Sequence, residues 1–293
     1  MNFCTPKEIV ANSLQTWVGK SRLSLFNTLA LGILAGAYIA FGAEGSTMAV
    51  HDLPGVGLGR VLAGILFATG LMLVIVCGAE LFTGNVLIWV GVLERKIPVE
   101  AMLRNWSLVY VANFIGSLLI VYLMYASGLW SFNNSLYGAA ALKIAVSKVN
   151  LSFTEAFVRG ILCNWLVCLA VWMTFASKDI TGKIFGIFFP IMLFVTSNFE
   201  HCIANMYYLP AGLMAKTLPA VVEASKLGAK VDTLTIQSIL ANNLLPVTLG
   251  NIVGGLVFVG TYYWFCYLRS TQCAATGTTE DLAPALAPIM EKN

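Results

Sequence analysis

One short stretch of the sequence places two titratable side chains where all their surroundings are apolar. Glu200 and His201 are adjacent in "SNFEHCIAN" (197–205), within an apolar run over residues 184–215 that holds no other charge. An ionised side chain is costly in apolar surroundings unless it is paired. Histidine changes its charge at about pH 6.5. The pair could therefore hold a hydrogen-bonded ligand or move a proton.

A second stretch has a related pattern. "CGAELFTGN" (77–85) places Glu80 in the apolar run over residues 61–93. When the two stretches are aligned, Glu80 corresponds to Glu200, whereas His201 corresponds to Leu81. The fold therefore does not require an imidazole at this position, and we predict a functional role for His201.

The composition indicates that both runs lie in a membrane. The chain has 293 residues, of which 58% are hydrophobic and 11% charged, and a mean hydropathy of +0.82. Soluble domains have about 45–50% apolar and about 25% charged residues. The net charge of +3 is small, which argues against a nucleic-acid partner. We expect a multi-pass protein of the cell membrane, surrounded by the lipid bilayer and without a removable signal peptide.

The seven cysteines show no pattern typical of a disulfide framework. Most of them lie in apolar segments, where a free thiol packs like a small hydrophobic side chain. No set of residues has metal-ligand spacing, so we predict neither a metal nor a cofactor.

The gaps between charged residues count the membrane crossings, because about 20 apolar residues span a hydrocarbon core of about 30 Å. Four gaps give one crossing each: 23–43, 105–128, 160–177 and 246–268. The runs 61–93 and 184–215 would be about 50 Å long as straight helices. Each has polar or small residues near its middle, so we predict six transmembrane helices, with the second and fifth broken.

The two halves of the chain resemble each other. "GILAGAYI" (32–39) recurs as "GILCNWLV" (160–167), and "ANFIGSL" (112–118) recurs as "GNIVGGL" (250–256). With three crossings in each half, the second copy must cross the membrane inverted. Transporters with this 3+3 layout place their site between broken helices near the midplane. We interpret the Asn-x-x-Gly motif of the second pair as helix packing.

The breaks leave backbone N–H groups that need partners. A carboxylate just before a half-helix can accept hydrogen bonds from those groups and lies at the positive end of the helix dipole. We assign loop-stabilising roles to four residues: Glu80, Glu200, Asn85 and Asn205. Two further polar residues, Thr83 and Asn164, are expected to face the conduit.

An even number of crossings puts both termini on one side of the membrane. That side carries 10 Lys and Arg residues against 7 on the other, so the positive-inside rule places both termini in the cytoplasm. We expect residues 1–24 to form an amphipathic cytoplasmic helix, residues 25–269 the channel domain, and residues 270–293 a flexible tail.

At these residues the chain resembles the formate/nitrite transporter family, over about residues 25–269. Four motifs carry the resemblance: "CGAELFTGN" (77–85), "GILCNWLVCLAVWM" (160–173), "FEHCIANM" (199–206) and "NNLLPVTLGNIVGG" (242–255). The resemblance implies an all-α homopentamer of aquaporin-like protomers, each with a pore narrowed by apolar constrictions on both sides of a chamber. By motif position it implies four substrate-facing residues: His201, Thr83, Asn164 and Lys148. It implies five constriction residues: Phe67, Leu71, Leu81, Phe82 and Phe194.

Small monovalent anions are the expected substrates, with formate first. Nitrite, hydrosulfide, lactate and acetate stay open, because "KVNLSF" (148–153) lacks the histidines that many formate channels have just after this lysine. His201 could donate a hydrogen bond to the anion or hand it a proton. Anion passage and proton-coupled transport are therefore both possible from the sequence.

Three rival functions lack their expected motifs. An aquaporin-like channel for neutral solutes would carry Asn-Pro-Ala at both breaks, and neither break has it. An intramembrane thiol oxidoreductase would need a Cys-x-x-Cys pair, but Cys163 and Cys168 are further apart. An intramembrane protease would need a serine nucleophile beside His201, and we interpret the nearest, Ser197, as a capping hydroxyl. We therefore expect no enzymatic activity.

Overall fold

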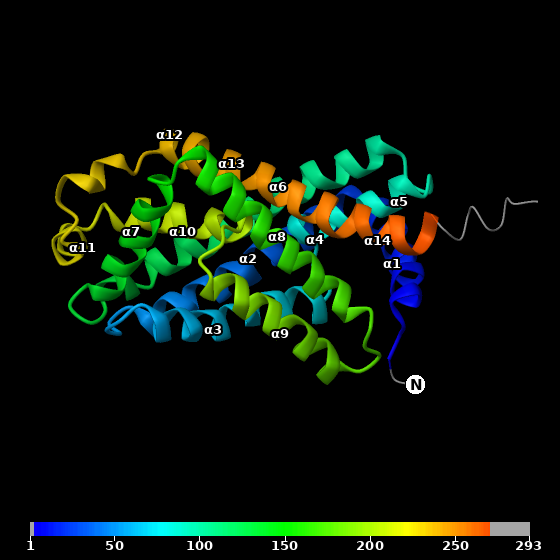
Figure 1. Cartoon of the computed structure of the whole chain (residues 1–293). Coiled ribbons are helices and arrows are strands. Elements are labelled where there is room, and N and C mark those ends of the chain that lie inside the picture. Colours follow the sequence, from blue (N-terminus) through cyan, green and yellow to red (C-terminus); the bar gives the residue numbers. More distant parts are fainter. Residues whose placement is uncertain (1–2, 270–293) are drawn as a thin grey trace, which may run out of the picture.

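The computed structural model describes residues 3–269 as a bundle of helices. Among these residues, five helices are long and apolar enough to cross a membrane: α2 (Leu25–Val50), α3 (Gly57–Val76), α6 (Val99–Ala126), α8 (Phe153–Thr174) and the segment Ile236–Arg269. They run roughly along one common direction (Figure 1). The tail predicted over residues 270–293 lies outside the described residues.

The helix that begins the first long apolar run, over residues 61–93, ends before the run does. α3 stops at Val76, and the next helix, α4 (Phe82–Asn85), begins after five intervening residues. Gly78 lies between them with φ +78°, a left-handed conformation that terminates helices. After α4, a 3-10 turn (Val86–Ile88) leads into α5 (Trp89–Leu93).

The second long apolar run has the same geometry. α9 (Ile180–Thr196) is followed by α10 (Cys202–Ala215), again after five residues. Asn198, with φ +58°, takes the place of Gly78. Asparagine is one of the few residues other than glycine that visit this conformation routinely.

Several helices extend beyond the spans predicted from charge gaps. α2 continues to Val50, past residue 43, and α6 begins at Val99, ahead of residue 105. α6 therefore includes Glu100 and Arg104. Charge gaps measure only the apolar part of a helix, and these helices continue into polar surroundings at their ends.

The last apolar segment is continuous but irregular. Its parts are, in order, α12 (Ile236–Ser238), a π-helical turn (Ile239–Leu244), α13 (Leu245–Gly255), a second π-helical turn (Leu256–Thr261), α14 (Tyr262–Trp264) and a third π-helical turn (Phe265–Arg269). Pro246 follows the first π-helical turn. It has no backbone N–H, so the regular hydrogen-bond ladder cannot run through it.

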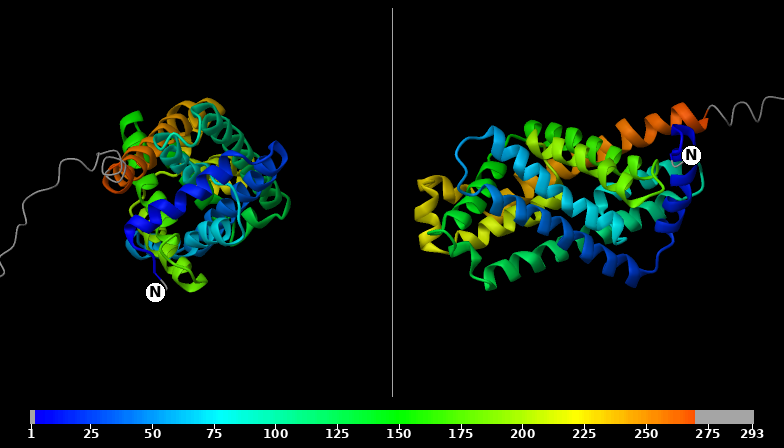
Figure 2. Two further views of the ribbon diagram at one scale, coloured as in Figure 1. Left: turned by 90° about the vertical axis from the view of Figure 1, so that its right-hand side faces the viewer. Right: turned by 90° about the horizontal axis from the view of Figure 1, so that it is seen from below.

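Short helices close the two ends of the bundle. α1 (Pro6–Ser21) crosses the end at which the described part of the last helix also finishes, whereas α7 (Leu136–Val149) and α11 (Pro219–Ser225) lie at the other end (Figures 1 and 2). Two 3-10 turns, Leu129–Ser131 and Gly228–Thr233, lie near α7 and α11. Both ends of the described chain are therefore on one side of the bundle.

Two helix pairs cross in backbone contact at glycine. A Cβ atom on Gly116 would lie 1.9 Å from the carbonyl oxygen of Ile33, and one on Gly254 would lie 2.3 Å from that of Ile161. The first contact joins α2 to α6, and the second joins α8 to α13. The glycine of each Asn-x-x-Gly motif thus allows the close packing expected from the sequence.

Candidate functional site

Glu80 lies in the first helix break and is 4% exposed. Its Oε1 accepts a hydrogen bond from Nζ of Lys20 at 2.5 Å, and its Oε2 accepts one from Nδ2 of Asn85 at 2.7 Å. Nδ2 of Asn85 also donates to Oδ1 of Asn105 at 2.9 Å, and Nδ2 of Asn105 donates to the carbonyl of Lys20 at 3.2 Å. The buried charge is therefore compensated by a lysine and a ring of amides.

Glu200 has matching contacts in the second break. Its Oε1 accepts from Nζ of Lys148 at 2.8 Å, and its Oε2 accepts from Nδ2 of Asn205 at 2.7 Å. Nδ2 of Asn205 also donates to Oδ1 of Asn243 at 2.7 Å, and Nδ2 of Asn243 donates to the carbonyl of Lys148 at 3.1 Å. Two rings of the same residue types, bonded in the same order, therefore hold the two breaks.

An asparagine holds the first backbone N–H of each half-helix. The amide of Phe82 donates to Oδ1 of Asn113 at 3.0 Å, and the amide of Cys202 donates to Oδ1 of Asn251 at 2.9 Å. Nδ2 of each asparagine donates to the backbone carbonyl of the nearby glutamate at 2.9 Å. The expectation that the glutamate carboxylates accept from these N–H groups is wrong, because lysine and asparagine side chains occupy those oxygens.

His201 is the N-cap residue of α10 and is 3% exposed. Its Nδ1 accepts a hydrogen bond from the backbone N–H of Ala204 at 3.1 Å. The proton of the neutral ring therefore lies on Nε2. Nε2 is 2.9 Å from Oγ1 of Thr83, so the two breaks meet at this bond.

Asn164 on α8 contacts the backbone of Thr83. Its Nδ2 donates to the carbonyl of Thr83 at 3.2 Å and to the carbonyl of Asn251 at 2.7 Å. Since both partners are carbonyls, the orientation of the amide is fixed. Its Oδ1 is fully buried and has no hydrogen-bond partner among residues 3–269. A buried acceptor without a partner is unusual and is suited to a donor on a ligand.

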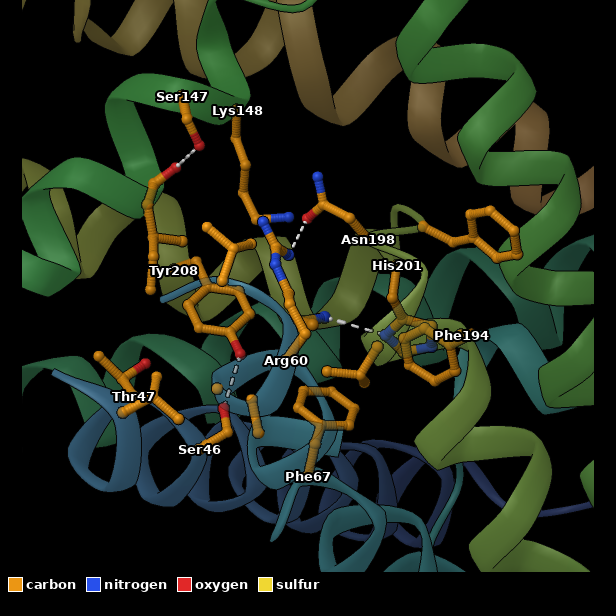
Figure 3. Close-up of a pocket in the computed structure, with 18 of the residues that line it drawn as sticks. Ser46, Thr47, Arg60, Phe67, Ser147, Lys148, Phe194, Asn198, His201 and Tyr208 are labelled. Carbon is orange, nitrogen blue, oxygen red and sulfur yellow. Dashed lines mark hydrogen bonds between the residues drawn. The ribbon is translucent and has the colours of Figure 1, made fainter. Parts of the chain in front are cut away.

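A cavity of about 270 Å³ contains His201 in its lining (Figure 3). It also reaches α7, at the end of the bundle opposite α1. Side chains from α2, α3, α7, α9 and α10 line it. The rings of Phe67 and Phe194 contact each other edge to face, with centroids 5.6 Å apart. The ring of Phe194 also stacks on the imidazole of His201 at 5.9 Å. An apolar pair therefore stands beside the imidazole.

The three other residues predicted to form constrictions are also buried. Leu71 on α3 is 2% exposed, and Leu81 and Phe82, where α4 begins, are each 3% exposed. The ring of Phe82 packs against Tyr110 and Trp106 of α6, with centroids 5.0 and 6.2 Å away. The structure thus places Phe82 against a helix as well as at the break.

Two cationic side chains line the cavity, and no carboxylate does so among the described residues. Lys148 forms the ion pair with Glu200 and has its Nζ 5.4 Å from the ring centre of Tyr208. Arg60 on α3 donates from Nη1 to Oδ1 of Asn198 in the second break.

Five residues of these networks were missed from the sequence: Lys20, Asn105, Asn198, Asn243 and Arg60. The internal repeat could have identified the first of them. Lys20 precedes Gly32 by the same number of residues as Lys148 precedes Gly160, and both glycines belong to the repeated "GIL" motif.

Comparison with known proteins identifies the family of this chain. The sequence profile described as formate/nitrite transporter matches residues 7–265. The chain belongs to the formate/nitrite transporter family. It is 41% identical over 269 residues to a probable formate transporter of Methanothermobacter thermautotrophicus, a match that covers 85% of this chain and 92% of the relative. It is 38% identical over 251 residues to the formate channel FocA of Escherichia coli (strain K12), covering 84% and 88%.

Two solved structures resemble this member of the formate/nitrite transporter family along most of its length. One, a pentameric formate channel with formate bound, has a TM-score of 0.73 and 38% sequence identity, and the match covers 83% of this chain and 98% of that one. The other, an FNT family ion channel, has a TM-score of 0.75 and 30% identity, with 88% and 98% covered. The protein is thus a multi-pass, all-helical member of a transporter family.

Proposed function

We propose that the protein is a formate channel that assembles as a homopentamer with one pore in each protomer. The names of its relatives support formate as the substrate, and the pentameric formate channel that it resembles supports the assembly. The observation that carries the proposal is the contact between His201 and Thr83, which joins the two helix breaks beside a cavity.

In the proposed architecture the chain crosses the membrane six times. α3 with α4 and α5 forms the broken second crossing, and α9 with α10 forms the broken fifth crossing. The two Lys-Glu-Asn-Asn rings support an inverted repeat, because each half supplies one ring of the same connectivity. Both termini are cytoplasmic, with residues 1–24 on the cytoplasmic face, and the protomer is aquaporin-like.

The proposed path enters the cavity, passes Phe67 and Phe194, and reaches His201. A bare anion is poorly solvated beside apolar side chains. These two rings therefore exclude ions that cannot form hydrogen bonds with the residues beyond them. Nε2–H of His201 and the hydroxyl of Thr83 offer donors inside. The anion replaces Thr83 as the hydrogen-bond partner of His201.

His201 acts in this proposal as a hydrogen-bond donor, and the substrate passes mainly as the anion. To hand over a proton and stay neutral, the ring would first need protons on both nitrogens. Nδ1 already accepts the N–H of Ala204, so a proton there would remove the cap of α10. Oδ1 of Asn164, whose Nδ2 donates to the carbonyl of Thr83, adds an acceptor for the acid form.

The polar residues at the breaks keep the donors in place. Four residues hold the loops through the two rings: Glu80, Glu200, Asn85 and Asn205. Lys148 faces the cavity while it neutralises Glu200. The pore is closed on its other side by three apolar residues: Leu71, Leu81 and Phe82. Membership of a transporter family gives no support to the two enzyme hypotheses.

Flux into liposomes that contain the purified protein tests this function. Formate, nitrite, hydrosulfide and acetate are supplied in separate experiments at equal gradients. We expect formate to enter faster than the other anions and much faster than into protein-free liposomes. Formate entry no faster than into protein-free liposomes would refute the function. Faster entry of nitrite or hydrosulfide would keep the channel and change its substrate.

A further inference from the structure

Arg60 carries a positive charge that no ion pair compensates within the described part of the chain. It lies in the first turns of α3 on the cavity wall, and no salt bridge joins it to a carboxylate among residues 3–269. Its guanidinium donates a hydrogen bond to the neutral amide of Asn198 (Figure 3). A guanidinium keeps its proton throughout the physiological pH range. The full charge of Arg60 is therefore available to an anion in the cavity.

Lys148 differs from Arg60 in this respect. Its Nζ lies 2.8 Å from Oε1 of Glu200, and the two side chains are 12% and 1% exposed. The fields of two opposite charges so close together largely cancel for an anion several ångströms away. Lys148 can still donate an N–H into the cavity, but the net positive charge there comes from Arg60.

The surroundings of Arg60 suit a small anion. Among the described residues the lining holds no carboxylate, so no negative side chain repels an anion beside Arg60. Apolar walls of low dielectric constant strengthen the field of a charge inside a cleft. A volume of about 270 Å³ leaves room for a small anion together with water.

We propose that Arg60 makes this cavity a binding site for a small monovalent oxyanion, which is held there before it passes Phe67 and Phe194. The inference rests on the proposed function and adds to it a residue that sets affinity at one mouth of the pore. The planar guanidinium can hold both oxygens of a carboxylate. Nη1 of Arg60 donates a hydrogen bond to Oδ1 of Asn198, and this bond fixes the position of the guanidinium.

The Arg60–Asn198 pair is not part of the repeated scaffold. Counting back from the paired residues Glu80 and Glu200, the position of Arg60 corresponds to Ile180 in the second half, and Asn198 corresponds to Gly78 in the first. The fold thus forms the other break without this cation and without this amide. Like His201, Arg60 is a polar residue that just one half of the chain contains. Such a residue indicates a role beyond folding.

Three variants separate the charge of Arg60 from its contact with Asn198. Arg60→Lys keeps the charge, whereas Arg60→Gln removes the charge and keeps an amide donor. Asn198→Gly removes the contact and keeps the charge, and glycine suits the φ of +58° at that position. Each variant is reconstituted into liposomes after its assembly and thermal unfolding have been compared with the wild type. The half-saturating formate concentration is then measured at low and high ionic strength.

At about 20 mM salt we expect Arg60→Gln to raise the half-saturating concentration about fivefold, and at about 500 mM salt we expect a difference below about twofold, because salt screens the charge. At low salt Arg60→Lys should raise the half-saturating concentration about two- to threefold, because lysine keeps the charge but cannot hold both oxygens of a carboxylate. Asn198→Gly should also raise it less than Arg60→Gln does, because the charge remains. Two results would overturn the inference: an Arg60→Gln variant with wild-type affinity and salt dependence, or equal losses in Arg60→Gln and Asn198→Gly.

The wild-type control separates this inference from the proposed function. If the wild type moves no formate but moves nitrite or hydrosulfide, the substrate assignment fails, and the same variants are compared with the anion that moves. If the wild type moves formate and Arg60→Gln behaves like the wild type, the inference about Arg60 fails alone.

Discussion

Nε2 of His201 lies 2.9 Å from Oγ1 of Thr83, although the two residues belong to opposite halves of the chain. Thr83 is in the first turn of α4, and His201 caps α10. The bond therefore joins the starts of the two half-helices. Because Nδ1 of the ring is committed to Ala204, the N–H of His201 points at Thr83, and an anion in its place would receive that hydrogen bond.

Thr83→Val should lower the free energy of unfolding by about 1–3 kcal/mol, because it leaves the buried Nε2–H of His201 without a partner. Thr83→Ser keeps the hydroxyl and is the matched control, with an expected loss below about 1 kcal/mol. Thermal unfolding of the purified proteins in detergent measures both. A Thr83→Val variant as stable as the wild type would show that the hydrogen bond of the hydroxyl group contributes nothing.

Asn113→Ala and Asn251→Ala should each destabilise the protein by about 2–4 kcal/mol, because each removes a helix cap and leaves buried backbone groups unpaired. Ser117→Ala on the same helix is the control, since the hydroxyl of Ser117 makes only a 3.4 Å contact with the carbonyl of Gly36. The same unfolding assay applies. An Asn113→Ala variant as stable as Ser117→Ala would contradict the capping role.

Gly116→Ala and Gly254→Ala test the two helix crossings. The added methyl groups would lie 1.9 and 2.3 Å from backbone oxygens, so each should cost about 1–3 kcal/mol or more and lower the yield of folded protein. Gly45→Ala is the control, since a Cβ there meets nothing within 4 Å. If Gly254→Ala unfolds at the wild-type temperature, the backbones of α8 and α13 are not in close contact at Gly254.

The sequence was sufficient for the helical membrane fold and for the positions at which the two long apolar runs are interrupted. Both follow from nearby residues: the length of each apolar run, and the position of Glu80 or Glu200 within it. The partners of these glutamates could not be read in the same way. Lys20 is 60 residues from Glu80 in the sequence, and Asn243, in the π-helical turn before Pro246, is 43 residues from its partner Glu200. Arg60 was missed because a lone cation at the end of an apolar run looks like an ordinary loop residue.

The first turn of α1 should open only in acid. Glu8 accepts hydrogen bonds from the backbone N–H and the hydroxyl of Thr5, at 2.7 and 2.9 Å, and these bonds lower its pKa below the ordinary value of 4.5. A carboxyl whose pKa is lowered by folding stabilises the helix start above pH 4.5, and this contribution is lost as the pH falls through its pKa in the folded state.

Hydrogen exchange of the first amides of α1 between about pH 3 and 6, corrected for intrinsic rates, measures this opening. Glu8→Gln should remove the pH dependence, because glutamine does not titrate. A wild-type midpoint above pH 4.5 would contradict the lowered pKa of Glu8.

Formate flux through His201→Asn in liposomes tests most directly whether the imidazole serves the passing anion. Asparagine is a good N-cap and should preserve the bond to Ala204, so the variant should unfold within about 1 kcal/mol of the wild type. Its shorter side chain cannot place a donor at the position of Nε2. We predict that formate flux falls at least about tenfold, which corresponds to the loss of one buried hydrogen bond to an anion. Flux equal to that of the wild type, from a folded variant, would contradict this role of His201.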